Sequence, residues 1–201
     1  MGYTYINYIS PLPPLSLEVS DIHPSKDILC ASSRLIEGKR IALGLCGSVA
    51  AMRSPDLARA LMRHGAEVFA FMSRASQSII SPDLMEWATG NPVVTALTGK
   101  IEHVALGGGE EGSADLVVIA PATANTVSKI ASGIDDTPVT SLATTAIGAG
   151  IPIVVAPAMH VSMMRHPAVV ENLKRLEGMG ITVLAPEIGR ASCRERVSSV
   201  V

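Results

Sequence analysis

The sequence predicts an α/β protein built on a parallel sheet, and three observations support this prediction. Short apolar runs rich in valine and isoleucine recur along the chain, such as LVVIA at residues 116–120. They are too short for helices and lack polar alternation, which is typical of strands buried on both faces. Segments with helical spacing separate these runs. The core is expected to be aliphatic, because 48% of the 201 residues are hydrophobic and only 3% are aromatic.

Length and charge exclude several classes of protein. A chain of 201 residues is long enough for one domain with a sizeable core. The net charge of −2 argues against a nucleic-acid-binding surface, and no apolar run reaches the roughly 18 residues that span a bilayer. The N-terminus lacks the regions of a signal peptide, and the three cysteines show no metal-ligand spacing and no even pairing. We therefore expect a cytoplasmic protein that binds no metal and no membrane.

The chain divides at two positions. Residues 1–37 form an N-terminal arm, which we expect to be mobile or loosely docked over residues 1–33 because they are proline-rich and aperiodic. Residues 38–186 carry the predicted fold. Residues 187–201 (EIGRASCRERVSSVV) lack an apolar period, and residues 187–197, back-translated, fit a common sequencing-adapter sequence. We interpret them as a non-native read-through tail, with a genuine basic tail as the alternative.

The first strand spans residues 40–46, and Gly47 follows it. Gly47 is expected to permit a tight turn, and Ser48 can offer its hydroxyl and its N–H to a phosphate. Ser54 is expected to cap the following helix, with Pro55 at its first position. A single glycine is not the GxGxxG pattern, so the dinucleotide fingerprint is absent.

The second strand spans residues 67–72. Ser73 and Arg74 come directly after it, where they either hold a phosphate or serve as a helix cap and a surface residue. A helix is predicted over residues 82–90, in which Trp87 is expected to lie in the core or in an interface. His103 then precedes a glycine run, and it is either a structural residue or an acid or base.

The most informative stretch is Ala114–Gly133. Its strand is expected to stop at Pro121, and its helix, residues 125–132, to end at Gly133. A strand that runs into small polar residues at a helix start is where open α/β sheets place ligands. The free N–H groups of a helix start suit an anionic ligand, although an ordinary strand–loop–helix connection would have the same pattern.

The last third of the chain repeats the alternation of helix and strand. Asp136 or Thr137 is expected to cap a helix that runs to Ile147. Strands follow at residues 151–156 and 181–185, on either side of a helix at 167–179.

Four motifs together resemble the flavin-dependent cysteine decarboxylases, and specifically the phosphopantothenoylcysteine decarboxylases. They are GSVAA at residues 47–51, EHVAL at 102–106, APATANTVSKIASGIDD at 120–136 and PAMHVSMMRHP at 157–167. Their order is that of the family, and the resemblance covers roughly residues 38–186. The resemblance is strongest to archaeal forms, in which a phosphopantothenate–cysteine ligase domain follows.

This resemblance implies a flavodoxin-like Rossmann three-layer fold that binds FMN. It also implies a homotrimer, or a dodecamer of trimers, with no nucleic-acid partner. The family pattern carries catalysis over to His103 and substrate binding to Met159 and His160. It carries cofactor binding over to Gly47, Ser48, Val49, Ser73, Ala75, Thr123, Ala124, Asn125, Thr126 and Ala158.

The implied reaction converts 4′-phospho-N-pantothenoylcysteine into 4′-phosphopantetheine in coenzyme A biosynthesis. The cysteinyl part is oxidised to a thioaldehyde, carbon dioxide leaves, and the product is reduced back by the flavin. His103 would act as the base or the orienting group in the oxidation. The chain departs from the family at His160, where an asparagine is usual. An asparagine amide can both donate and accept hydrogen bonds, whereas a neutral histidine offers one donor and one acceptor and a protonated one offers two donors.

Three other functions are compatible with parts of the pattern. A flavin prenyltransferase-like enzyme would bind FMN and a prenyl phosphate, but the TANT and PAMH pieces favour the decarboxylase. A non-catalytic FMN-binding regulatory module is the second, and retention of His103 argues against it. A nicotinamide-dependent dehydrogenase is the third, and the missing GxGxxG and missing acidic residue after the second strand argue against it.

Overall fold

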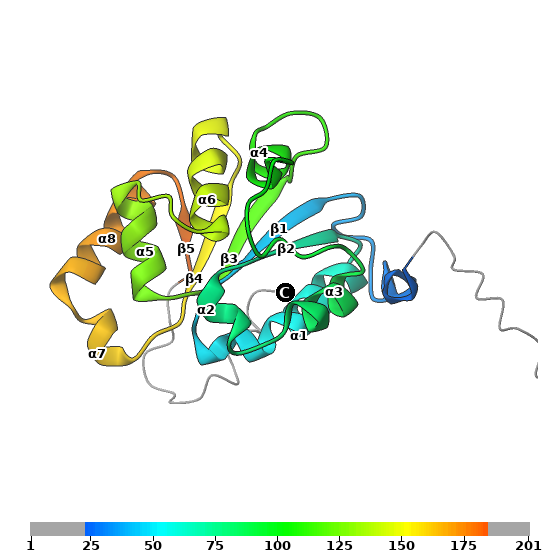
Figure 1. Cartoon of the computed structure of the whole chain (residues 1–201), viewed down its shortest axis with the longest axis horizontal. Coiled ribbons are helices and arrows are strands. Elements are labelled where there is room, and N and C mark those ends of the chain that lie inside the picture. Colours follow the sequence, from blue (N-terminus) through cyan, green and yellow to red (C-terminus); the bar gives the residue numbers. More distant parts are fainter. Residues whose placement is uncertain (1–22, 185–201) are drawn as a thin grey trace, which may run out of the picture.

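A computed structural model describes residues 23–184, in which five parallel strands form one sheet with the order β2-β1-β3-β4-β5 (Figure 1). This all-parallel order is the flavodoxin-like one, so the fold predicted from the sequence is confirmed. The strands are β1 (Arg40–Leu45), β2 (Glu67–Met72), β3 (Leu116–Ala122), β4 (Ile153–Pro157) and β5 (Thr182–Val183).

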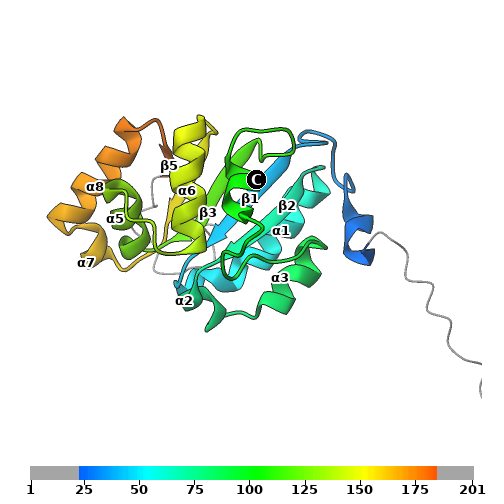
Figure 2. The ribbon, with the colours of Figure 1, turned by 45° about the horizontal axis from the view of Figure 1, so that its top comes forward.

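Helices cover both faces of the sheet and give the fold three layers (Figures 1 and 2). On one face lie α1 (Ser54–Arg63) and α3 (Pro82–Thr89), packed against each other. On the other lie α4 (Glu102–Gly107), α5 (Ala124–Ser132), α6 (Pro138–Ala149) and α8 (Pro167–Gly178). Short elements connect these pieces: η1 (Pro24–Ile28), η2 (Val49–Arg53), α2 (Arg74–Gln77) and α7 (Val161–Met164).

The strands alternate between two hydrophobic cores. Leu43 and Leu45 of β1 join the core beneath α1 and α3, whereas Ala42 joins the core beneath α6. In β3, Val118 belongs to the first core, and its neighbours Val117 and Ile119 belong to the second. Since successive side chains of a strand point to opposite faces, every position of a strand covered on both faces must be apolar, which explains the continuous runs.

Most predicted helix ends are confirmed. Gly90 and Gly133 end α3 and α5 in the left-handed conformation that favours glycine. Thr137 is the N-cap of α6 and forms a reciprocal capping box with Thr140. The chain therefore terminates its helices largely by local hydrogen bonding that the sequence encodes.

Two expectations were wrong, and so was one of the two alternatives for a third residue. Ser54 is not an N-cap, because η2 runs directly into α1, and its hydroxyl instead donates to the Ala120 carbonyl at 3.3 Å. Pro121 does not end its strand, because β3 continues to Ala122 across a register shift against β4. For Trp87 the core alternative is excluded, because the residue is 52% exposed and the Arg59 guanidinium lies 4.7 Å from its ring centre. The interface alternative stays a prediction.

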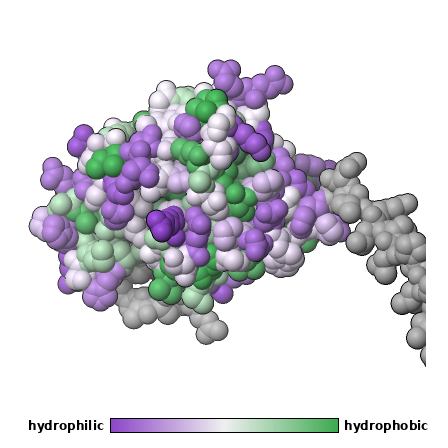
Figure 3. Space-filling model, viewed as in Figure 1, coloured by the Kyte–Doolittle hydropathy of each residue, from purple (hydrophilic) through white to green (hydrophobic). Residues whose placement is uncertain are grey.

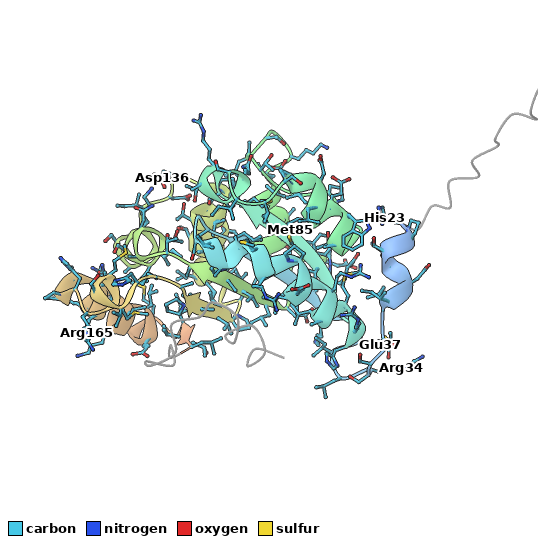
Figure 4. The ribbon with its side chains drawn as sticks, turned by 90° about the horizontal axis from the view of Figure 1, so that it is seen from below. His23, Arg34, Glu37, Met85, Asp136 and Arg165 are labelled. Atoms are coloured by element: carbon cyan, nitrogen blue, oxygen red, sulfur yellow. The ribbon has the colours of Figure 1, made fainter. Side chains whose placement is uncertain are left out.

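Residues 23–37 of the expected N-terminal arm pack at one end of the molecule, where Figure 4 labels His23, Arg34 and Glu37. The Cys30 N–H donates to the Met62 carbonyl at 3.1 Å, which fixes the arm to the end of α1. The Lys26 ammonium pairs with Glu67 of β2 at 3.2 Å. The rest of the arm, and the predicted read-through tail at 187–201, lie outside the described residues.

The face seen in Figure 3 mixes hydrophilic and hydrophobic side chains. Among residues 23–184, no helix combines the length and the apolar character needed to cross a membrane.

Candidate functional site

The topology of the sheet points to the carboxyl ends of β1 and β3 as the place for a ligand. The chain leaves β1 for β2 on one side, and β3 lies on the other side, so the direction of winding reverses between β1 and β3. Open parallel sheets bind ligands outside the strands at such a reversal. Three loops follow adjacent strands here, with α2, η2 and the start of α5 at the same end of the sheet (Figure 1). We call them the strand-end cluster: residues 47–49, 73–75 and 123–126.

Gly47 connects two of these loops by close approach. A Cβ at this position would lie 2.5 Å from the Cβ of Ala75, a distance that real Cβ atoms do not reach. Gly47 is absent from the glycines with left-handed backbone. The tight turn expected from the sequence is therefore not the reason for a glycine here, and the reason is the contact with α2.

Each loop of the cluster is closed by a hydroxyl that accepts a hydrogen bond from the backbone. Ser48 Oγ accepts from the Ala50 N–H at 3.4 Å, and Ser73 Oγ accepts from the Ser76 N–H at 3.3 Å. Thr123 Oγ1 accepts from the Thr126 N–H at 3.3 Å, and the two threonine hydroxyls lie 3.1 Å apart. The loops are therefore set in shape by their own side chains.

Backbone N–H groups of the cluster remain available to a ligand. In the described part of the chain, no hydrogen bond engages the N–H groups of Gly47, Val49, Arg74, Ala75, Ala124 and Asn125. Free N–H groups at helix starts, with the positive ends of the helix dipoles behind them, bind phosphate and other anions. All of these residues except Ala124 are exposed. The arrangement fits the phosphate and polar ring edge of a flavin mononucleotide.

A buried cysteine links the first and third loops, and reasoning from the sequence missed it. Cys46 is 1% exposed, and its N–H donates to the Pro121 carbonyl at 3.2 Å. Burial raises the pKa of its thiol to about 11, against a smaller opposite effect of hydrogen bonds with Thr126 and the Thr123 backbone. The thiol is therefore neutral at pH 7. Its place directly before Gly47 was the signal in the sequence.

The segment after β4 approaches the same edge. The Ala158 N–H donates to the Ala122 carbonyl at 2.8 Å, which holds this residue beside the third loop. Met159 is partly buried and packs against the core beneath α6. His160 is exposed and is the N-cap of α7, where its Nδ1 accepts from the Ser162 N–H at 3.2 Å. The structure thus brings Ala158 to the cluster and leaves His160 at its open side.

His103 lies on a separate element. It belongs to the first turn of α4, which packs against α6, and no hydrogen bond or ion pair within residues 23–184 joins it to the strand-end cluster. Its Nδ1 is buried and has no hydrogen-bond partner in the structure. The residue as a whole is partly exposed.

The residues before His103 form a tight local structure. Ile101 is 53% exposed and adopts φ +47°, a left-handed conformation that is unfavourable for a β-branched residue. The Glu102 carboxylate accepts hydrogen bonds from the Thr98 hydroxyl and, at 3.0 Å, from the Thr98 N–H. These two bonds lower the pKa of Glu102 to about 2.

Comparison with known protein families gives one match over most of the chain. The family model described as Flavoprotein matches residues 29–200. The bifunctional coenzyme A biosynthesis protein CoaBC of Thermococcus kodakarensis is 54% identical over 172 residues, which are 85% of this chain and 42% of that protein. The CoaBC protein of Methanocaldococcus jannaschii is 36% identical over 178 residues, again 42% of its length. The chain thus spans about two fifths of these relatives.

Solved structures resemble this one in fold and in sequence. The FMN-dependent cysteine decarboxylase SpaF has a TM-score of 0.67 at 32% identity, over 76% of this chain and 86% of its own. HAL3 from Cryptococcus neoformans has a TM-score of 0.63 at 30% identity, over 81% and 94%. A PPC decarboxylase mutant complexed with pantothenoylaminoethenethiol has a TM-score of 0.62 at 28% identity, over 81% and 95%.

Proposed function

Because this chain belongs to the Flavoprotein family, we propose that it binds FMN and decarboxylates 4′-phospho-N-pantothenoylcysteine to 4′-phosphopantetheine in coenzyme A biosynthesis. The observation that carries the proposal is the strand-end cluster, whose free N–H groups lie at the sheet position where this topology binds FMN. Its similarity to CoaBC proteins and to PPC decarboxylase supports the choice of substrate.

The cofactor would lie across the three loops of the cluster. We assign its phosphate to Gly47, Ser48, Val49, Ser73 and Ala75, and its ring system to Thr123, Ala124, Asn125, Thr126 and Ala158. When bound, FMN supplies an acceptor and then a donor of two electrons. Cys46, kept neutral beneath the loops, adds no negative charge next to this anionic cofactor.

Two histidines and a methionine serve the substrate in this proposal. His103 holds or moves a proton through Nε2, because its Nδ1 is buried. His160 and Met159, which leave β4 beside the cluster, hold the cysteinyl end of the substrate. A carboxylate accepts hydrogen bonds only, so an imidazole N–H at residue 160 is a suitable partner for it.

The wider assembly is part of the same proposal. We infer a homotrimer, or a dodecamer of trimers, because His103 has no hydrogen bond or ion pair to the cluster among the described residues and a second copy could supply the missing neighbour. The relatives are bifunctional and much longer than this chain, which supports a ligase domain beyond it in the full protein. A cytoplasmic location would follow from that metabolic role.

The alternatives are distinguished by measuring the bound flavin and the release of carbon dioxide. A flavin prenyltransferase-like enzyme or a non-catalytic FMN-binding module would also purify with FMN, but neither would release carbon dioxide from phosphopantothenoylcysteine. The relatives' names favour the decarboxylase over both.

We expect the purified protein to show the visible absorption of a flavin, with FMN as the released cofactor by mass, and to decarboxylate the substrate. His103→Asn should keep the bound flavin and reduce turnover by about 10²-fold or more, the usual contribution of a positioned acid or base. A matched control is His64→Asn, because His64 contacts Ser33 at the N-terminal arm. Unchanged turnover in His103→Asn would contradict the role given to His103.

A further inference from the structure

Three histidines of residues 23–184 cap helices in the same way. His23, His160 and His166 each stand at an N-cap, and in each the Nδ1 atom accepts a hydrogen bond from the N–H two residues later, at 3.2 Å. A backbone N–H can only donate, so Nδ1 must carry the lone pair in all three. The remaining proton of the neutral ring is then on Nε2.

His160 differs from the other two by a second bond to the same atom. The Ser162 hydroxyl lies 2.7 Å from His160 Nδ1, in addition to the Ser162 N–H. At His166 the corresponding residue is Ala168, which has no hydroxyl. Both donors of Ser162 thus converge on one side of the His160 ring, and the opposite side carries Nε2–H.

His160 lies close in sequence to a residue that is bonded to the strand-end cluster. The residue is exposed, follows β4 two positions after Ala158, and lies on the side of the molecule where Figure 4 labels Arg165 at the end of α7. Ala158 is bonded to the third loop of the strand-end cluster. Residue 160 thus follows, by two positions, a residue that is bonded to the cluster.

We propose that Ser162 is a positioning residue that holds the His160 ring with Nε2–H outward, so that residue 160 offers the substrate one hydrogen-bond donor and no acceptor. Rotating the ring by half a turn would break both bonds from Ser162. An asparagine amide at this position could present either its N–H₂ or its carbonyl oxygen. The fixed imidazole presents only a donor, which suits a hydrogen-bond acceptor such as a carboxylate and disfavours a group that can only donate.

This inference rests on the proposed function for the identity of the substrate, but not for the state of the ring. Its first test is the nitrogen spectrum of the histidine rings in the FMN-loaded, ¹⁵N-labelled protein. We expect His160 and His166 to carry the proton on Nε2. In Ser162→Ala the His160 Nδ1 resonance should move toward that of free histidine, whereas Ala168→Ser should leave it unchanged.

The second test is kinetic. Ser162→Ala should raise KM for phosphopantothenoylcysteine by about three- to tenfold, the effect of one hydrogen bond, with little change in kcat. Ser162→Thr, which restores a hydroxyl, should return KM toward the original value. The affinity for 4′-phosphopantetheine should not change in either variant, because that product lacks the carboxylate.

Several results would overturn the inference. A proton on His160 Nδ1 would exclude the ring orientation, and an unchanged KM in Ser162→Ala would exclude the positioning role. Equal losses of affinity for substrate and product would show that Ser162 acts only on structure. If the unsubstituted protein binds FMN but releases no carbon dioxide, the proposed function fails, and the ring spectra still decide whether Ser162 orients His160.

Discussion

The strand-end cluster differs from residues Thr98–His103, which we call the His103 segment, in the contacts that hold it in shape. In the cluster, serine and threonine hydroxyls close each loop, and a buried cysteine and a close glycine contact join the loops. In the His103 segment the residues are mostly exposed, Ile101 is held in a left-handed conformation, and a buried ring nitrogen of His103 has no partner.

This difference indicates how the two halves of the proposed site depend on the fold. The cluster follows from the order of the strands, since any parallel sheet that winds in this way brings three loop ends together. The His103 segment depends instead on a few local hydrogen bonds and on a conformation that its own sequence disfavours. A substitution in the cluster should therefore damage folding and cofactor binding together, whereas one in the segment should affect mainly the proton chemistry.

The strongest way to break the cluster is Gly47→Ala. The added methyl would lie 2.5 Å from the Ala75 Cβ, so β1 and α2 must separate. We expect a loss of roughly 1–3 kcal/mol in the free energy of unfolding, as in other overpacked sites, together with loss of bound flavin. Denaturant unfolding and the flavin absorbance of the purified variant measure the two effects.

A matched control is Gly148→Ala in α6. Nothing lies within 4 Å of a Cβ there, and its backbone is not left-handed. Alanine in a helix is better than glycine by about 0.5–1 kcal/mol, so this variant should be slightly more stable and keep its flavin. If Gly47→Ala behaves like Gly148→Ala, the contact between the first two loops does not shape the cluster.

Ile101→Gly tests the other side of the comparison. A left-handed conformation costs a residue with a Cβ about 1–2 kcal/mol, and the exposed Ile101 side chain loses little when removed. We expect the free energy of unfolding to stay the same or to rise by up to about 1 kcal/mol, because glycine also adds entropy to the unfolded chain. Denaturant unfolding measures this change.

Val104→Gly, one turn further into α4, is the comparison variant. Val104 is 37% exposed and sits in ordinary helix, so its replacement should lower stability by about 0.5–1 kcal/mol. Equal losses in the two glycine variants would mean that the conformation of Ile101 stores no strain.

The contrast between the two regions also explains how much the sequence could predict. The strands were predictable because burial on both faces leaves runs without polar residues, and the ends of α3, α5 and α6 carry residues with clear capping chemistry. Gly47 to Val49 and Thr123 to Thr126 were each expected to follow a buried strand, and the carboxyl ends of parallel strands share an edge. Family resemblance, not physical reasoning, selected which of these residues bind the cofactor.

What could not be predicted depends on contacts distant in sequence. The reason for Gly47 is Ala75, which lies on another loop, and Cys46 is buried by a strand more than 70 residues away. Ser54 looked like a cap because the preceding helical turn, η2, has no apolar period of its own. Short helices such as α4 and α7 give too few residues to show a period, so the surroundings of His103 and His160 required the structure.

The smallest expected effect is a pH dependence confined to the His103 segment. The pKa of Glu102 is lowered to about 2 from 4.5, first by the Thr98 hydroxyl and then by the Thr98 N–H. A lowered pKa means that the ionised carboxylate stabilises the folded state. This stabilisation is complete above pH 4.5 and is lost as the pH falls toward 2.

Asp115 also has a lowered pKa, owing first to the Arg40 N–H and then to Lys39, so it too loses stabilisation as the pH falls. This loss occurs in the unsubstituted protein and in Glu102→Gln alike. The difference between the two proteins therefore isolates the contribution of Glu102. The unfolding temperature of the unsubstituted protein should exceed that of Glu102→Gln at pH 7, and the difference should shrink below pH 4.5. The difference should be small, because Glu102 lies at the surface and its charge is screened. A difference that stays constant down to pH 3 would show that the Thr98 bonds do not depend on the charge. The charge of Glu102 would then contribute nothing to holding the His103 segment.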